Sequence, residues 1–325
     1  MSDKVIEFLL SNPGRFFSGE EISKSLGISR QALWKKISSL RKNGWNVEGK
    51  AGKGYRLASI PSHVELETLR ATFSEKNFWE EIHILESVDS TNSFLLKRYE
   101  GGIKRAIAIG DEQSSGRGRM GRRWFSPRGK NINMSVLLPL AVSPALSPAI
   151  TIVAGLSVAG AIRDKFKIPC QVKWPNDVYL AGKKLCGILT EMVAELDSTR
   201  SVVIGIGINV NSERRDFPPH LRDLVISLKE YTGKDIMRVD VASSVVELLL
   251  RNLEIFQRRG LEMFIEKWNR LSFLKGKVVT LRTGKEKVQG EVKGIHRERG
   301  YLVLEDEGGN RFEIISGDVE EIRDR

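Results

Sequence analysis

The spacing of apolar residues changes twice along this 325-residue chain, and the two changes limit the number of domains that it can form. Up to about Leu57 the pattern is helical and then glycine-rich and basic, and Pro61 marks a break because proline disfavours helix before it. The pattern then mixes strands with helices to about Phe273, and from Lys275 it consists of short strands. We therefore predict three domains, over residues 1–60, 61–274 and 275–325.

The predicted fold class is α+β, with a winged helix-turn-helix first, a mixed α/β region in the middle and a small β-barrel at the end. The strands expected in the barrel are Val278–Arg282, Val288–Ile295, Tyr301–Glu305 and Arg311–Ile315. The longest apolar run, Ala149–Ile162, is shorter than the roughly 20 residues of a membrane span. We therefore expect a buried helix there and no membrane partner.

The first region has the pattern of a helix-turn-helix. A short helix opens at Ser18, and Gly27 after it can adopt the left-handed conformation of a turn. Ser29 is the expected N-cap of a second helix over residues 30–42, whose apolar side chains repeat at helical spacing. The opposite face of that helix carries basic and amide-bearing side chains, as a DNA-recognition helix does.

A basic, glycine-rich hairpin follows and resembles the wing of such a domain. Trp45 and Val47 begin it, and residues 49–56 form its tip and return. The formal net charge of +11 favours a polyanionic partner, although a basic protein can also be merely soluble. The other interpretation is a helical hairpin that packs on the rest of the chain, with solvated charges. The residues predicted to bind DNA are Arg30, Gln31, Trp34, Lys35, Lys50 and Lys53.

The number of cysteines indicates the cellular compartment in which the protein is expected. The two cysteines, Cys170 and Cys186, can form neither a disulfide framework nor a zinc site, and the first residues lack the pattern of a signal peptide. We therefore expect a reducing, cytoplasmic location.

The segment Gly116–Trp124 alternates four arginines with glycines and ends in an aromatic residue. Guanidinium groups form bidentate bonds with carboxylate and phosphate oxygens, and glycines allow the backbone to approach a ligand. No Gly-Lys-Ser/Thr follows, so it is not a Walker loop. Taken alone, the segment is also compatible with a disordered RNA-binding tract or a solvated loop.

The segment Val172–Leu180 brings a lysine, an aromatic ring, an amide and a carboxylate together before an expected hairpin turn at Ala181-Gly182. Asp177 can hold Mg²⁺, which prefers oxygen ligands and substrate phosphates. Asn176 can bond a phosphate or a base. The other interpretation is a simple turn, because Pro-Asn-Asp is favourable turn chemistry.

Two further segments carry residues that can mark a ligand site, one in an expected strand and one before an expected helix. Val202–Asn211 is an apolar strand with two glycines, which indicate close approach of the backbone to a ligand or to a packing neighbour. It lacks the third glycine of a dinucleotide fingerprint. Asp89–Asn92 precedes an expected helix over residues 93–99, either as an N-cap cluster or as a set of donors to a ligand.

Taken in order, these segments resemble the biotin–protein ligase family. The motifs that carry the resemblance are Asp89-Ser90-Thr91-Asn92, Gln113, Gly116–Trp124, Lys173-Trp174-Pro175-Asn176-Asp177, Lys184-Leu185-Cys186-Gly187 and Gly205-Ile206-Gly207-Ile208-Asn209. The helix-turn-helix before them and the small barrel after them, which the resemblance implies to be SH3-like, are similar to the repressor-type members. The resemblance therefore covers almost the whole chain.

The resemblance implies a role for each matching residue. Those implied to bind biotin are Ser90, Thr91, Asn92, Gln113, Arg117, Gly118, Arg119 and Lys184. Those implied to hold the nucleotide are Arg122, Trp124, Asn176 and Asn209. Arg119 and Lys184 are the catalytic pair, at the reacting carboxylate and phosphate. Met120 departs from members that have arginine there, and Lys183 and Cys186 receive no role.

The implied reaction joins biotin to ATP as biotinyl-adenylate and then transfers biotin to a lysine of a biotin carboxyl carrier protein of acetyl-CoA carboxylase. Both reactants are anions, so cationic side chains and Mg²⁺ address the main barrier, which is charge repulsion and positioning. No Gly-x-Ser-x-Gly motif is present, and none of the four histidines lies in a motif.

A repressor function is implied as well. Biotinyl-adenylate is expected to order the arginine segment and favour a homodimer that binds operator DNA at paired half-sites. Three alternatives stay open. They are a lipoate-type ligase, a ligand-sensing transcription factor without catalysis, and a ligase whose first domain no longer binds DNA.

Overall fold

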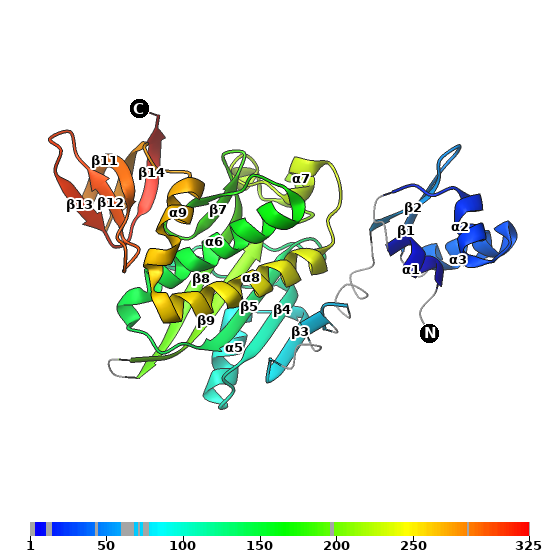
Figure 1. The fold of residues 1–325 in the computed structure, drawn as a ribbon, viewed down its shortest axis with the longest axis horizontal. Coiled ribbons are helices and arrows are strands. Elements are labelled where there is room, and N and C mark those ends of the chain that lie inside the picture. Colours follow the sequence, from blue (N-terminus) through cyan, green and yellow to red (C-terminus); the bar gives the residue numbers. More distant parts are fainter. Residues whose placement is uncertain are drawn as a thin grey trace.

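The structure is a computed structural model, and it describes residues 4–10, 15–42, 45–59, 68–70, 72–73, 78–195, 198–284 and 286–324. Figure 1 shows a small N-terminal unit, a central sheet with helices on both faces, and a β-rich C-terminal unit. The α+β class is thus confirmed. The predicted break at Pro61 lies outside the described residues, and the division at residues 60 and 274 stays a prediction.

The N-terminal unit consists of α1 (Lys4–Leu10), α2 (Gly19–Leu26), α3 (Arg30–Lys42) and a hairpin of β1 (Asn46–Lys50) and β2 (Gly54–Ser59). Its helix ends follow the sequence. Ser18 caps α2, Gly27 has a φ of 64°, and the Ser29 hydroxyl accepts from the Ala32 amide at 3.1 Å. The predicted winged helix-turn-helix pattern is therefore confirmed.

The central sheet has seven strands in the order β3-β4-β5-β9-β8-β7-β6. Only β3 and β4 pair in parallel, and every other pair is antiparallel. The strands are β3 (Glu81–Val88), β4 (Ala106–Gln113), β5 (Ile132–Pro139), β6 (Gln171–Lys173), β7 (Asp177–Leu180), β8 (Lys183–Glu195) and β9 (Ser198–Ile208). The expected hairpin turn at Ala181-Gly182 joins β7 to β8, with both residues at positive φ.

Helices cover both faces of this sheet. On one face, α5 (Thr91–Glu100) packs on Ala108, Leu137 and Val203. On the other, residues of alternate register such as Ile204 join a larger core with α6 and α8. The α-helices that follow α5 along the chain are α6 (Ser147–Phe166), α7 (Leu228–Thr232), α8 (Arg238–Arg259) and α9 (Ile265–Leu271).

Helix α6 is the expected buried helix. The segment Pro144–Phe166 is long and apolar enough to cross a membrane, but 72% of its most apolar stretch is buried inside the protein. Within Ala149–Ile162 every residue except Thr151 is buried. The apolar run is thus accounted for by packing between the sheet and α8.

The C-terminal unit is a five-stranded antiparallel sheet in the order β13-β12-β11-β10-β14. Its strands are β10 (Val278–Thr283), β11 (Glu286–Ile295), β12 (Leu302–Glu305), β13 (Arg311–Ile314) and β14 (Asp318–Arg323). The predicted count of four strands was wrong, because β14 is an edge strand in which four of six residues are charged, so no apolar alternation reveals it. The unit docks on the centre partly through Trp174, whose indole nitrogen donates to the Gly300 carbonyl at 3.2 Å.

Candidate active site

A cavity of about 500 Å³ lies in the central region and is lined by residues of the sheet strands, the arginine segment and β14. It collects residues that are far apart in the sequence. The predicted residues that line it are Ser90, Thr91, Asn92, Gln113, Arg117, Gly118, Arg119, Arg122, Trp124, Asn176, Asp177, Lys184 and Asn209. The structure therefore brings together every residue predicted to bind biotin, nucleotide or metal.

One end of the cavity is built on the start of α5. Ser90 caps the helix, and the Thr91 amide donates to Gln113 Oε1 at 2.9 Å. The buried Ser135 hydroxyl lies 2.7 Å from Thr91 Oγ1 and 2.6 Å from Asn92 Oδ1, so it holds both side chains. Sequence reasoning missed Ser135. The signal was present, because Asn133 and Ser135 alternate with apolar residues in β5.

The amide of Asn92 is fully engaged by the protein. Its Nδ2 donates to Glu191 Oε2 at 2.7 Å and to the Leu189 carbonyl at 3.2 Å, while Oδ1 contacts Ser135. A Cβ on Gly205 would lie 2.2 Å from Asn92 Oδ1, which explains this glycine in the middle of β9. Asn92 therefore shapes the wall of the cavity, and its polar atoms are already bonded.

Glu191 on β8 links this wall to the arginine segment. Its two carboxylate oxygens accept from Arg117 Nη2 at 3.0 and 2.9 Å, and one of them also accepts from Asn92. Arg117 therefore already has an anionic partner. Glu191 was not predicted, because nothing in its local sequence separates it from an ordinary exposed strand residue.

The arginine segment folds into a small hairpin. The Gly118 amide donates to the Arg122 carbonyl at 2.7 Å, and the Trp124 amide donates to the Gly116 carbonyl at 2.8 Å. Met120 lies at its tip with a φ of 54° and 70% of its surface exposed. Met120 does not line the cavity.

Two arginines of this hairpin contact the C-terminal unit. Arg119 Nη2 donates to the Ser316 hydroxyl at 3.0 Å, and Nη1 lies 3.4 Å from Asn176 Oδ1. Arg122 forms an ion pair with Asp318. Burial lowers the pKa of Arg119 below its ordinary value, with Asp318 and Asp177 acting in the opposite direction. Neither Ser316 nor Asp318 was predicted, because their contacts depend on how the C-terminal unit docks.

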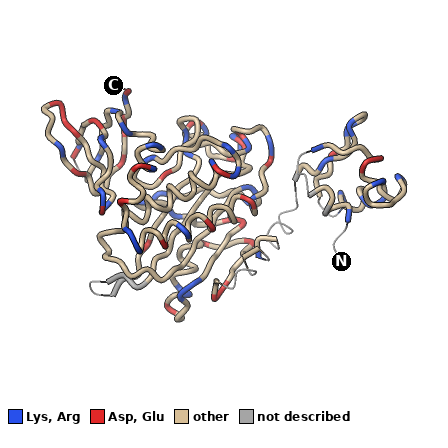
Figure 2. Tube along the Cα trace, in the orientation of Figure 1, with Lys and Arg blue, Asp and Glu red and all other residues tan. Residues whose placement is uncertain are grey.

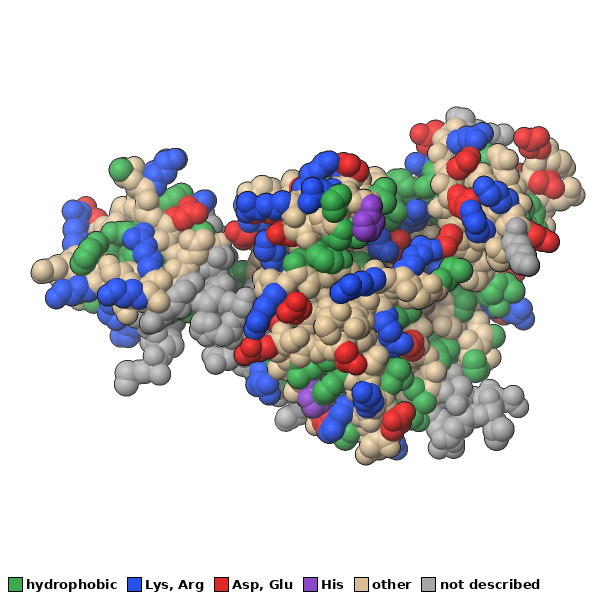
Figure 3. Space-filling view, turned by 180° about the vertical axis from the view of Figure 1, so that it is seen from behind, with side chains coloured by type: hydrophobic (Ala, Val, Ile, Leu, Met, Phe, Trp, Pro, Cys, Tyr) green, Lys and Arg blue, Asp and Glu red, His purple; other side chains and the backbone are tan. Residues whose placement is uncertain are grey.

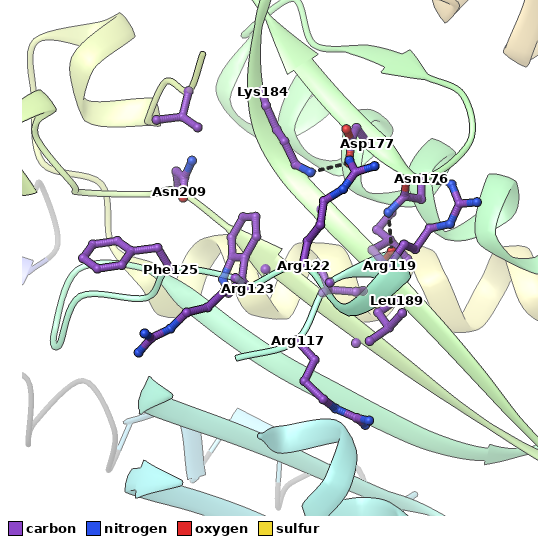
Figure 4. Close-up of a pocket in the computed structure, with 18 of the residues that line it drawn as sticks. Arg117, Arg119, Arg122, Arg123, Phe125, Asn176, Asp177, Lys184, Leu189 and Asn209 are labelled. Atoms are coloured by element: carbon purple, nitrogen blue, oxygen red, sulfur yellow. Dashed lines mark hydrogen bonds and ion pairs between the residues drawn. The ribbon is translucent and has the colours of Figure 1, made fainter. Parts of the chain in front are cut away.

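Lys184 lies beside Asp177 in the cavity, near Arg119 and Arg122 (Figure 4). Its Nζ is 2.7 Å from Asp177 Oδ1 and 5.9 Å from the centre of the Trp124 ring. Across the described part of the chain, no group of three His, Cys, Asp or Glu side chains could hold a metal ion. Asp177 is therefore a single carboxylate that already pairs with a lysine.

Trp124 and Asn209 line another end of the cavity. The Trp124 indole nitrogen donates to Asn133 Oδ1 at 3.1 Å, and a Cβ on Gly207 would lie 2.3 Å from the ring. The glycines of β9 thus mark packing neighbours, which is one of the two roles expected for them. Asn209 is 1% exposed, and its Nδ2 donates to the Ile226 carbonyl at 3.2 Å. Among the described residues, Asn209 Oδ1 accepts one long hydrogen bond, from Asn131 Nδ2 at 3.4 Å.

The residues predicted to bind DNA lie apart from this cavity, on the N-terminal unit. Arg30, Gln31, Trp34 and Lys35 are exposed on α3, and Lys50 and Lys53 are exposed on the hairpin. Trp34 is 59% exposed, which is unusual for tryptophan away from an interface. Lys and Arg outnumber Asp and Glu along this unit and on its visible face (Figures 2 and 3).

Comparison with known families gives three matches along the chain. Residues 84–209 match the Biotin/lipoate A/B protein ligase family, residues 2–56 match an HTH domain, and residues 276–320 match the Biotin protein ligase C terminal domain. The first range contains most of the residues that line the cavity, the second contains α2 and α3, and the third contains β10 to β13.

Relatives are similar over nearly their full length. The bifunctional ligase/repressor BirA of Bacillus subtilis is 34% identical over 97% of this chain and 97% of its own. The bifunctional ligase/repressor BirA of Escherichia coli is 35% identical over 92% and 91%. The biotin protein ligase of Aquifex aeolicus, solved in complex with biotin and ATP, has a TM-score of 0.64 and 32% identity, covering 76% of this chain and 100% of its own.

Proposed function

This chain belongs to the family of bifunctional biotin ligase/repressors, and on that basis we propose that it forms biotinyl-adenylate from biotin and ATP, transfers biotin to a carrier protein and represses transcription. The observation that carries the proposal is the convergence on one cavity of cations from separate segments, with Arg119 and Lys184 both lining it. Two anions must meet for this reaction, and fixed positive charges lower the barrier by offsetting their repulsion.

Biotin is assigned to the end built on α5. The polar wall of this end is formed by Ser90, Thr91 and Gln113. Ser135 holds this wall in place through its bonds to Thr91 and Asn92. The Gln113 amide nitrogen has no hydrogen-bond partner in the part of the protein that the structure describes, so it can donate to the ureido oxygen of biotin. Arg117 and Gly118 line the same cavity, and Arg117 can exchange Glu191 for the carboxylate of biotin.

ATP is assigned to the end that Trp124 and Asn209 line. Trp124 offers an aromatic surface to the base, Asn176 and Arg122 can bond phosphates, and Asn209 Oδ1 can accept one bond. A carboxylate oxygen of biotin attacks the α-phosphorus, and pyrophosphate leaves. Lys184 and Arg119 stabilise the charge that develops between the two reactants, so no side-chain nucleophile is required.

We propose that Mg²⁺ enters this site as a partner of the substrate phosphates, with Asp177 as its protein ligand. Mg²⁺ is typically held by one or two carboxylates together with phosphate oxygens, so Asp177 alone is compatible with it. The ion would neutralise phosphate charge, while Lys184 would move from Asp177 to the reacting groups. In the transfer step the acceptor lysine amine attacks the carbonyl carbon of the mixed anhydride and loses a proton, the bond from that carbon to the phosphate oxygen breaks, and AMP leaves. We propose the carrier domain of acetyl-CoA carboxylase as the source of that lysine.

The decisive experiment is mass spectrometry of the purified protein after incubation with biotin, ATP and Mg²⁺. Bound biotinyl-adenylate and released pyrophosphate support the ligase, and a ligand sensor without catalysis would release none. The same reaction with lipoate in competition separates a biotin ligase from a lipoate ligase. An absence of adenylate with either vitamin would overturn the proposal.

Repression is assigned to α3 and the hairpin that follows it. Lys50 and Lys53 can contact phosphates, while Gln31 and Arg30 can reach base edges. Binding through several phosphate contacts must weaken steeply as salt rises. Titration of operator-like DNA at two salt concentrations tests this, and binding that is insensitive to salt, or absent in every ligand state, would reject it.

A homodimer promoted by biotinyl-adenylate is the proposed binding form. β8 pairs with β7 only as far as Gly187, and from Leu189 onward the described residues supply no strand at this outer edge. Unpaired strand edges favour pairing with another chain. This edge includes Glu191, which holds Arg117, so ligand binding and dimerisation can be coupled. Sedimentation with and without adenylate tests the coupling, and equal association in both would remove it.

A further inference from the structure

Lys173 is a cation of the cavity for which the motif comparison gave no role. It is the last residue of β6, its side chain is half-buried, and it lines the same cavity as Lys184. Its Nζ donates to the Tyr179 hydroxyl at 2.9 Å and lies 4.6 Å from the centre of the Tyr179 ring. Tyr179 in turn packs against Phe273, with ring centres 5.2 Å apart, so the lysine is held in place.

Three of the other cations that line the cavity have carboxylate partners, whereas Arg119, like Lys173, bonds neutral groups. Lys184 pairs with Asp177, Arg122 with Asp318 and Arg117 with Glu191. Lys173 forms no ion pair within 4 Å with any residue that the structure describes. Burial lowers its pKa below the ordinary lysine value, and the more distant Asp177 and Asp318 offset only part of that effect.

A half-buried ammonium group with only a neutral partner is destabilising unless an anion joins it. Tyr179 cannot be that anion, because burial raises the pKa of its hydroxyl to about 12 and keeps it protonated. The hydroxyl leaves the remaining protons of the ammonium available to a ligand. The Lys173 ammonium can therefore still bind an anion, and it lines the same cavity as the residues assigned to phosphate.

We propose that Lys173 binds the β- and γ-phosphates of ATP and stabilises pyrophosphate as it leaves. This inference rests on the proposed ligase function. In that step the biotin carboxylate forms a bond to the α-phosphorus, and the bond from the α-phosphorus to the oxygen that bridges to the β-phosphate breaks. The electron pair stays on that oxygen, and the Lys173 ammonium stabilises the new charge without giving up a proton.

The alternative is that Lys173 accepts a proton from the acceptor amine in the transfer step. The two roles affect different half-reactions. A side chain that binds pyrophosphate affects adenylate formation and its reversal, and it has no effect once pyrophosphate has left. A general base matters only for transfer from adenylate that is already formed.

The test measures both half-reactions in the Lys173→Met variant of the full chain. We expect kcat/KM for ATP in pyrophosphate release to fall about 10- to 100-fold, the range for one charge-assisted hydrogen bond, and pyrophosphate to act more weakly in the reverse reaction by a similar factor. Transfer from supplied biotinyl-adenylate to the carrier protein should stay within about twofold. Lys183→Met, a neighbouring lysine outside the cavity lining, is the matched control and should change neither.

Tyr179→Phe keeps the ring and the lysine charge but removes the hydroxyl that orients it. This variant should raise the KM for ATP and weaken the binding of pyrophosphate in the reverse reaction. It should not slow the transfer of biotin to the carrier protein. Slower transfer in either variant, or unchanged adenylation in Lys173→Met, would overturn the inference. If the wild-type chain makes no adenylate, the ligase proposal fails instead, so the two failures are distinguishable.

Discussion

Arg122, in the arginine hairpin, forms an ion pair with Asp318 on the edge strand of the C-terminal unit, 196 positions further along the chain. The pair connects the glycine- and arginine-rich segment of the site to a strand of a separate sheet. With Arg119 bonded to Ser316, it places the C-terminal unit at the cavity itself. The unit therefore positions arginines that are assigned to the substrates.

We predict that Asp318→Asn loosens the arginine hairpin without unfolding the protein. The pair is partly exposed, and such pairs contribute only about 0–1 kcal/mol to stability. Limited digestion with trypsin should cut faster at Arg119 and Arg122 in the variant. Glu320→Gln, on the same strand but paired with Arg282 and Lys287, is the control. Equal cleavage of Asp318→Asn and wild type would show that the ion pair does not restrain the hairpin.

Arg119→Ala and Lys184→Ala should each lower the rate of adenylate formation about 10²- to 10³-fold, the loss typical of one preorganised donor. Pyrophosphate release with biotin and ATP measures this. Arg119→Ala should also release bound biotinyl-adenylate faster. Lys183→Ala serves as the control because Lys183 does not line the cavity. Near-native rates in both variants would reject the two assignments.

Gly207→Ala should damage the nucleotide end selectively. The added methyl group would overlap the Trp124 ring, so the ring must move and lose its bond to Asn133. Overpacking of this kind costs about 1–3 kcal/mol. KM for ATP and tryptophan fluorescence report the displacement. Gly155→Ala on α6 is the control, because its methyl group would meet only ordinary contacts at 3.6 and 3.8 Å. An unchanged KM for ATP in Gly207→Ala would contradict the role of Trp124.

Ser135→Ala should weaken biotin binding while leaving KM for ATP unchanged. The hydroxyl holds Thr91 and Asn92, and loss of a buried hydrogen-bond partner costs about 1–3 kcal/mol. Isothermal titration with biotin measures the change. Ser157→Ala removes a buried hydroxyl from α6, bonded to Val153 and Asn252, and should lower stability only. Similar biotin affinities for the two variants would place Ser135 outside the binding wall.

Stability should depend on acid through Glu81. Its hydrogen bond with Arg98, with a further contribution from His83, lowers its pKa from an ordinary value of 4.5 to about 2. A carboxyl whose pKa is lower in the folded state stabilises it above the unfolded pKa, and this contribution disappears as pH falls from about 4.5 to about 2. Glu81→Gln should therefore lower the free energy of unfolding at pH 7 but make little difference near pH 2.

Urea denaturation at the two pH values checks this. Glu86→Gln is the control, because Glu86 has a highly exposed side chain whose ion pair with Arg128 is solvated. A constant difference between wild type and Glu81→Gln across the whole pH range would contradict the shifted pKa.

Local features of the protein follow from its sequence. Ser18, Gly27 and Ser29 set the helix ends in the N-terminal unit, because capping and left-handed turns depend on residues within one turn of helix. The apolar run of α6 predicted a buried helix, because a long stretch of apolar residues is stable only when it is removed from water. The motif residues of the cavity could also be named, since their order and spacing resemble those of a family.

Partners between distant segments were decided by the tertiary structure alone. Glu191 meets Asn92 because β8 and the start of α5 converge at the cavity wall, and Asp318 meets Arg122 because the C-terminal unit docks beside the hairpin. Local periodicity records which face of a strand is buried, but it does not record which element lies opposite. Sheet order and docking determine that. They show that several residues predicted to bind substrates already bond another part of the protein.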